Sequence, residues 1–216
     1  KAQVLHELPP KIENNIHLHF TDTDLLTYKK TLQQIRLKIN AAVSKKKYGE
    51  ILKGLLELRQ RCLWQKYDGE NIEADIGLKQ IYSTKIKFLI ENLQQIIDAG
   101  NKAIVFSQFT TYLDIIQRAL HEKHWKLARI DGTQSMKKRQ QQIELFQNGD
   151  APVFLISLKA GGVGLNLTAA SYVFIMDPWW NPAVESQAID RAHRIGQTNT
   201  LTVYRPIIKE IGRAHV

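Results

Sequence analysis

Hydrophobic positions in the first part of the chain repeat with two different periods. Ile16, Leu18 and Phe20 alternate with polar residues, and this period of two predicts one short strand. Further along, apolar residues recur at three- and four-residue intervals, which predicts two amphipathic helices. Their apolar faces are formed by Leu32, Ile35, Ile39 and Val43 in the first helix and by Tyr48, Ile51, Leu52, Leu55 and Leu58 in the second.

From residue 83 onward, predicted helices and strands alternate. Residues 86–97 have helical spacing that ends at Gly100, and the next run, 102–106, is almost entirely apolar, which is typical of a strand covered on both faces. The alternation continues through helix 110–123, strand 127–130, helix 135–147, strands 153–157 and 172–176, a helix over 181–196, and strand 201–204. This order predicts an α/β fold with a parallel sheet and helices on both faces. In such folds, sites lie beyond the carboxyl ends of the strands.

A stretch without a long apolar run, residues 68–79, separates these two parts of the chain. It contains glycine and asparagine, and we interpret it as a linker. We therefore expect a mostly helical segment over residues 1–82 and a larger α/β domain over residues 83–209.

The predicted helix over residues 181–196 brings two arginines together. Asn181 suits the N-cap, Pro182 suits the first helical position, and Gly196 can end the helix in a left-handed conformation. Two sets of residues recur at helical spacing: Gln187, Arg191 and Arg194 on a polar face, and Val184, Ala188, Ala192 and Ile195 on a stripe to be buried. The polar face is either a binding surface for anions or a solvated face on which Asp190 pairs with Arg194.

A glycine-rich loop, residues 157–166 (SLKAGGVGLN), follows a predicted buried strand. Its glycines allow the backbone to approach an anion, so the loop is either a phosphate site or a tight turn that needs positive φ angles. The loop is neither a Walker A sequence nor a dinucleotide fingerprint, and no Asp-Glu dipeptide occurs that could begin a D-E-x-H box. We expect that the chain cannot hold ATP and Mg²⁺ unaided.

Composition adds a second indication of an anionic partner. The chain has 30 Lys and Arg against 21 Asp and Glu, a formal net charge of +9, which favours nucleic acid as a partner or simply keeps a basic domain soluble. The single cysteine, Cys62, excludes an intrachain disulfide and a multi-cysteine zinc site, so no metal site is expected. No apolar run reaches the length of a membrane span, and no signal peptide opens the chain.

Four motifs resemble a known family in order and spacing: KAIVFSQFT (102–110), RIDGTQS (129–135), SLKAGGVGLNLTAAS (157–171) and DPWWNPAVESQAIDRAHRIGQ (177–197). They are similar to the second RecA-like lobe of Swi/Snf-family ATPases, the double-stranded-DNA translocases of helicase superfamily two. Upstream, residues 8–13 (LPPKIE) and 55–62 (LLELRQRC) resemble the segment joining the two lobes. The resemblance implies a joining segment over 1–82 and a RecA-like helicase C-terminal domain over 83–209. Residues 210–216 depart from the family pattern and are expected to be an artefactual tail.

The resemblance also implies roles for individual residues. Arg191 and Arg194 would be arginine fingers that reach the γ-phosphate of ATP held by the first lobe, with Gln187 beside them. Gly162, Gly164 and Asn166 would couple the nucleotide cleft to the DNA groove. Four residues would lie near the DNA backbone: Ser107, Gln108, Lys159 and Gly161. Ser107 and Gln108 could instead cap the following helix, and Trp179 and Trp180 could belong either to a translocation surface or to core and interlobe packing.

The resemblance further implies cofactors, partners and location. ATP and Mg²⁺ would be bound mainly by the N-terminal lobe, and the partners would be that lobe, double-stranded DNA and nucleosomes, in the nucleus. The isolated chain is expected to be inactive as an ATP hydrolase. There are two alternative functions: a dinucleotide-dependent enzyme, whose glycine fingerprint is missing from this sequence, and a free-standing DNA-binding or scaffold module without ATPase activity.

Overall fold

The computed structural model describes residues 8–44, 48–64, 82–158, 165–179 and 181–209. Two compact units can be distinguished, and each is described by itself. The sheet unit comprises the described residues of Lys1–His17 and Phe88–Ile207, and the hairpin unit comprises those of Leu18–Lys87 and Ile208–Val216. None of the helices in these ranges has the length and apolar character of a membrane span.

The sheet has six strands in the order β1-β6-β5-β2-β4-β3. The pairs β6–β5, β5–β2, β2–β4 and β4–β3 are parallel. The strand bounds are β1 Lys11–Leu18, β2 Ala103–Ser107, β3 Leu127–Ile130, β4 Val153–Ser157, β5 Tyr172–Ile175 and β6 Leu201–Ile208. The predicted parallel α/β sheet is confirmed, because β2 and β4 are buried along their whole length, as strands covered on both faces must be.

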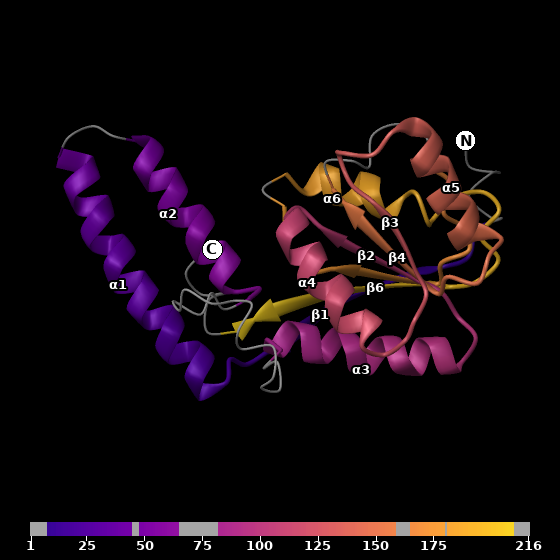
Figure 1. Ribbon diagram of the computed structural model, residues 1–216, viewed down its shortest axis with the longest axis horizontal. Helices are drawn as coiled ribbons and strands as arrows, with labels where there is room; N and C mark the ends of the chain where they lie inside the picture. Colours follow the sequence, from indigo (N-terminus) through magenta and orange to yellow (C-terminus); the bar gives the residue numbers. More distant parts are fainter. Residues whose placement is uncertain (1–7, 45–47, 65–81, 159–164, 180, 210–216) are drawn as a thin grey trace. The chain divides into compact units, whose positions relative to one another are not determined.

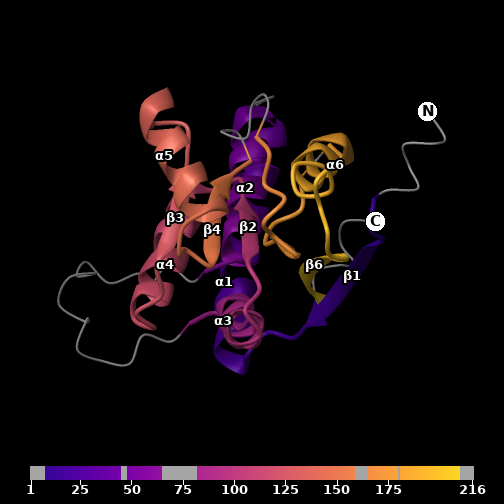
Figure 2. The ribbon, with the colours of Figure 1, turned by 90° about the vertical axis from the view of Figure 1, so that its right-hand side faces the viewer.

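Helices lie on both sides of this sheet, as Figure 2 shows, with α3 and α4 on one side and α5 and α6 on the other. Their bounds are α3 Thr84–Asp98, α4 Thr110–His121, α5 Met136–Gln147 and α6 Pro182–Ile189. Strand β5 shows why both faces need cover. Val173 and Ile175 belong to the core that also contains Phe146 of α5, while the alternate residue Phe174 contacts Phe88 of α3 with ring centroids 6.4 Å apart.

The first strand of the chain is an edge strand of the sheet. The sequence placed it in a mostly helical segment over residues 1–82, but β1 neighbours β6, and Leu201 donates its N–H to the carbonyl of Pro10 at 3.0 Å. The chain passes from one compact unit to the other after His17 and again after Lys87, and not at residue 83. The predicted linker 68–79 and the tail 210–216 lie outside the described residues.

The hairpin unit contains α1 (Asp22–Ser44) and α2 (Tyr48–Arg61), which appear as the indigo and purple helices of Figure 1. Gly54 allows a close approach of the two helices, because a Cβ atom at this position would lie 2.7 Å from Cγ2 of Ile35. The apolar faces predicted from periodicity are only partly buried. Ile35 and Leu58 belong to the core of this unit, whereas Val43, Tyr48 and Leu52 are more than half exposed. Val43 and Tyr48 lie at the ends of α1 and α2, and Leu52, two residues before Gly54, lies on a different side of α2.

Candidate functional site

Two buried groups fix the turn that follows β2. The hydroxyl oxygen of Ser107 accepts a hydrogen bond from the backbone N–H of Phe109 at 3.1 Å, and the carboxylate of Asp177 accepts from the N–H of Gln108 at 3.1 Å. Ser107 is fully buried, while Gln108 is partly exposed. Ser107 therefore stabilises the turn and does not cap α4, whose N-cap residue Phe109 makes no side-chain cap hydrogen bond. The sequence did not lead us to predict a role for Asp177, although an aspartate directly after a buried strand is a recognisable signal of one.

The helix predicted over residues 181–196 ends early. Its start is confirmed, since Asn181 is the N-cap and accepts from the N–H of Ala183 at 3.0 Å, but α6 stops at Ile189. Carbonyl groups that would continue the helix bind donors from outside it. The N–H of Leu167 donates to the carbonyl of Arg191 at 2.9 Å, and the buried Gln197 side chain donates to the carbonyl of Ala192 at 3.2 Å. The N–H groups of Asp190, Ala192 and His193 still donate to carbonyls of α6, but Leu167 and Gln197 bind the carbonyls that a helix reaching residue 196 would use.

Residues 190–197, which we call the arginine turn, are held in place at several points. The side chain of Gln197 also donates to the carbonyl of Ala170 at 2.7 Å, and its own oxygen accepts from the N–H groups of Thr198 and Asn199, each at 3.0 Å. Gly196 has the positive φ angle, 101°, that was predicted for it. Ile195, predicted to be buried, is 67% exposed because it lies in this turn and not on a helical stripe.

The prediction that Gln187, Arg191 and Arg194 share one helical face is wrong. Gln187 is exposed on α6, whereas Arg191 is buried and Arg194 is exposed in the arginine turn. Burial, and then the positive charge of Arg194, lowers the pKa of the Arg191 guanidinium below its ordinary value. Among the ion pairs of the described residues, none joins Asp190 to Arg194. The turn therefore brings two like charges near one another.

The glycine loop leads into a segment that contacts the arginine turn. Lys159, Gly161, Gly162 and Gly164 lie outside the described residues, as does Trp180. Asn166 is exposed at the beginning of the described segment that follows. Because the next residue, Leu167, is fully buried and bonded to the Arg191 carbonyl, the carboxyl side of the loop is attached to the arginine turn.

Glu185 on α6 is the centre of a second group of contacts that the sequence did not indicate. Its carboxylate accepts from the N–H of Trp179 at 2.6 Å and from Nε of Arg205 at 3.3 Å. Arg205, on β6, also pairs with Glu13 on β1 at 2.8 Å. Glu185 is buried, so it does more than complement the positive end of the helix dipole. Glu185 connects α6 to β6 and to the loop that follows β5, and Arg205 extends the connection to β1.

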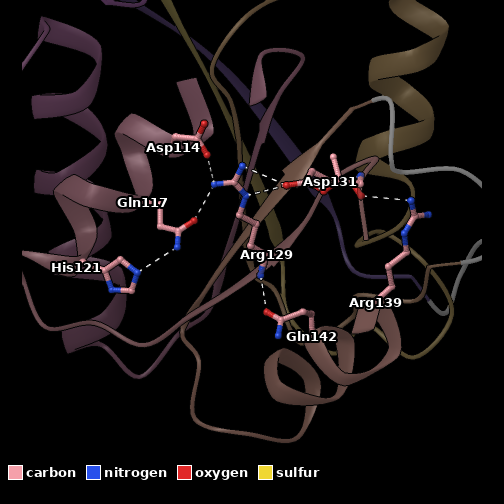
Figure 3. A network of polar contacts seen from close by, with 8 residues as sticks. Asp114, Gln117, His121, Arg129, Asp131, Arg139 and Gln142 are labelled. Carbon is pink, nitrogen blue, oxygen red and sulfur yellow. Dashed lines mark hydrogen bonds and ion pairs between the residues drawn. The ribbon is translucent and has the colours of Figure 1, made fainter. Parts of the chain in front are cut away.

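A polar network surrounds Arg129 at the carboxyl end of β3 (Figure 3). The Arg129 guanidinium contacts Asp114 at 2.7 Å, Gln117 at 2.8 Å and Asp131 at 3.2 Å, while the backbone N–H of Arg129 donates to the side-chain oxygen of Gln142 at 2.9 Å. These contacts connect α4, β3 and α5. The RIDGTQS motif is therefore a rigid turn, and the charge of Arg129 is already matched by carboxylates.

Asp131 in this network is the hydrogen-bond acceptor that shapes the turn. It accepts from the hydroxyl of Thr133 at 2.6 Å and from the N–H of Thr133 at 3.0 Å. Burial alone would raise the pKa of the Asp131 carboxyl, but the bonds from Thr133 and the charge of Arg129 outweigh burial and lower it. Arg139 of α5 donates to the Asp131 carbonyl at 3.3 Å, so the start of α5 is attached to the same turn.

Comparison with known proteins identifies the family. Residues 84–196 match the model described as the helicase conserved C-terminal domain. The chain belongs to this family. It is 47% identical over 138 residues to the DNA repair protein RAD5A of Arabidopsis thaliana, a match that covers 63% of this chain and 13% of that protein. The chain thus corresponds to a small part of this much longer relative.

Solved structures agree with this assignment. The C-terminal part of the Fun30 ATPase domain superposes with a TM-score of 0.78 at 26% identity, covering 94% of this chain and 87% of that one. The Sulfolobus solfataricus SWI2/SNF2 ATPase core in complex with double-stranded DNA gives 0.74 at 29% identity, covering 96% of this chain and 43% of that one. The expected Swi/Snf-type, RecA-like C-terminal lobe is confirmed, and the fold is that of these lobes.

Proposed function

We propose that the chain is the C-terminal lobe of an ATP-dependent double-stranded-DNA translocase and that Arg191 and Arg194 act on ATP bound by another lobe. The observation that carries this proposal is the arginine turn. Its backbone is fixed by hydrogen bonds from Leu167 and Gln197, and it holds the buried guanidinium of Arg191, whose pKa is lowered first by burial and then by the charge of the exposed Arg194.

An anion fits this arrangement for a physical reason. Two positive charges near one another repel, and the repulsion is strongest where burial reduces the screening by water. A triphosphate with its Mg²⁺ would relieve the repulsion and bring the reacting phosphoryl group to the arginines. Because charge grows on the transferred group's oxygens in the transition state, fixed guanidinium groups stabilise that state more than bound ATP. Gln187, exposed on α6, would lie beside them.

The DNA-facing part of the proposal concerns the loops at the carboxyl ends of β2 and β4. The S. solfataricus relative is described as a complex with double-stranded DNA, and this chain carries a net charge of +9. Gln108 is accessible, and Lys159 and Gly161 would complete the surface near the DNA backbone. Gly162, Gly164 and the exposed Asn166 would couple the nucleotide cleft to the DNA groove. Ser107 would contribute by shaping the turn, since its buried hydroxyl is bonded to Phe109.

The cellular setting is proposed by analogy with relatives. RAD5A is named a DNA repair protein, which supports a nuclear protein that moves on DNA in repair. Action on nucleosomes is a second setting in which the same lobe would serve. In both, the ATP and Mg²⁺ would be held mainly by the N-terminal lobe.

Reconstitution with the N-terminal lobe tests the proposal. The chain alone should hydrolyse no ATP above background, with or without duplex DNA, and hydrolysis should appear only when the first lobe is supplied. Steady turnover by the purified chain, after contaminating ATPases are excluded, would overturn the assignment. DNA binding without any turnover in the two-lobe protein would instead favour the DNA-binding module.

A further inference from the structure

The arginine turn is bonded to the segment through which the chain enters the sheet. Nε2 of His193 lies 2.8 Å from the carbonyl oxygen of Pro9. A carbonyl oxygen only accepts hydrogen bonds, so Nε2 carries the proton and donates it. The contact spans 184 positions of the chain, and His193 stands between Arg191 and Arg194 in sequence. It is therefore a direct connection from the start of the sheet unit to the residues between the two arginines.

A second connection joins the beginning of the sheet unit to α6, the helix that precedes the arginine turn. Arg205 on β6 bonds both Glu13 on β1 and Glu185 on α6, at 2.8 Å and 3.3 Å. Glu13 also pairs with Lys11 at 2.7 Å, and the pKa of Glu13 is lowered first by this bond to Lys11 and also by Arg205. Residues 8–13, which we call the incoming segment, are thus attached both to the arginine turn and to the helix before it.

The arginine turn has hydrogen-bond anchors on both sides of His193. Leu167 and Gln197 bind the carbonyls of Arg191 and Ala192, and the N–H of Gln197 donates to the carbonyl of Arg194 at 2.9 Å. The side chain of His193 adds a hydrogen bond between these anchors, to a partner from a different part of the chain. A displacement of about 1 Å at a reacting group can cost on the order of a hundredfold in rate.

We propose that His193 is a positioning residue, which sets the placement of Arg191 and Arg194 according to the position of the incoming segment at Pro9. This inference rests on the proposed function. Residues 8–13 resemble the segment that joins the two lobes of Swi/Snf-family ATPases, so in a two-lobe protein the position of the incoming segment would depend on how the lobes are arranged. The bond from His193 makes the arginines fully competent only when that segment is seated on β6.

Variants of His193 in the protein that carries both lobes test the proposal. His193→Leu removes the hydrogen-bond donor but keeps a side chain of similar volume. His193→Gln keeps an N–H donor near the position of Nε2, whereas the side chain of His193→Asn is one bond shorter, so its N–H donor cannot reach that position. We expect kcat for DNA-stimulated ATP hydrolysis to fall about tenfold to a hundredfold in the leucine and asparagine variants, with KM for ATP changed less than about twofold. Glutamine should restore kcat to within about threefold of the parent.

A second readout needs no bound ATP. Amide hydrogen exchange in this chain should become faster at residues 190–197 in His193→Leu, and not in His193→Gln, while the strands of the sheet keep their protection. His121→Leu, a change of the same type at an exposed position on α4, serves as the control and should leave exchange at 190–197 and kcat unchanged.

Parallel measurement of Arg194→Ala separates the two proposals. If Arg194→Ala abolishes hydrolysis while His193→Leu keeps the parental kcat, the positioning role is refuted and the proposed function stands. Equal losses in the glutamine and leucine variants would also refute it, because the donor would then be irrelevant. If Arg194→Ala itself hydrolyses ATP normally, the proposed function fails, and the exchange measurement alone then decides whether His193 holds the turn.

Discussion

Replacing Arg194 by alanine separates catalysis from folding better than any other change in the arginine turn. The Arg194 side chain is exposed, and its backbone carbonyl keeps the hydrogen bond from Gln197 at 2.9 Å whichever side chain is present. Surface substitutions of this kind usually change the free energy of unfolding by less than about 0.5 kcal/mol. We therefore expect the melting temperature of the chain to stay nearly unchanged.

The effect on ATP hydrolysis should be far larger. Arginine fingers contribute on the order of 10³–10⁵ in rate, which corresponds to roughly 4–7 kcal/mol of barrier. Removing the charge of Arg194 also removes one cause of the lowered pKa of Arg191, so Arg191 stays protonated and its loss of charge cannot explain the defect. Arg194→Lys should be impaired as well, because an ammonium group lacks the planar pair of donors.

Arg191 is the less informative position, since its side chain is 8% exposed. Alanine there removes buried side-chain packing together with the charge, and we expect about 1–3 kcal/mol of lost stability. A loss of activity in Arg191→Ala would therefore mix two causes.

The assay compares DNA-stimulated ATP hydrolysis by the two-lobe protein at saturating duplex DNA with equilibrium binding of a fluorescent ATP analogue. Hydrolysis by Arg194→Ala should fall by orders of magnitude, while the affinity for the analogue changes less than about tenfold because the first lobe carries most of it. The reasoning is wrong if Arg194→Ala unfolds the domain and the surviving molecules remain fully active. Arg194 would then be a structural residue on a solvated surface.

Three further predictions concern DNA and stability. Binding to duplex DNA should be insensitive to base sequence, and a plot of the log of the binding constant against the log of the salt concentration should have a slope of about −0.9 per phosphate contacted. Replacing the exposed Lys137 by glutamine should make this slope less steep if Lys137 contacts a phosphate, and a flat salt response measured by anisotropy would contradict the prediction. Gly54→Leu should cost about 1–3 kcal/mol of unfolding free energy in urea titrations because of the 2.7 Å approach to Ile35, whereas Gly49→Leu, with no atom within 4 Å, should not. The pKa of the Asp131 carboxyl is lower in the folded chain than its unfolded value of 3.8, so Asp131 stabilises the fold above that pH, and this contribution is lost as the pH falls toward the folded pKa. The difference in unfolding free energy between the parent and Asp131→Asn should therefore persist at pH 7 and shrink in acid. A difference that does not change with pH would exclude this linkage.

The order of helices and strands could be predicted from local pattern alone. Buried parallel strands such as β2 and β4 are short runs of apolar residues with polar residues at their ends, and nothing elsewhere in the chain is needed to recognise them. The helix start at Asn181 and the positive φ angle of Gly196 were equally local, because capping and glycine conformation depend on a few neighbouring residues.

Only the tertiary structure decided where the arginines lie. Helical spacing placed Gln187, Arg191 and Arg194 on one face, but donors from Leu167 and Gln197 bind the carbonyls that a longer helix would use. Each of those donors comes from a residue whose position depends on the packing of the whole sheet, so periodicity could not reveal them.

The same limit applies to contacts between distant parts of the chain. The joining of β1 to β6, the bond from His193 to Pro9 and the pairing of Arg205 with Glu13 connect residues more than 180 positions apart. A strand of period two shows which residues face the core but not which strand lies beside it. Partners at such separations are chosen by the fold, and with them the attachment of the arginine turn to the beginning of the chain.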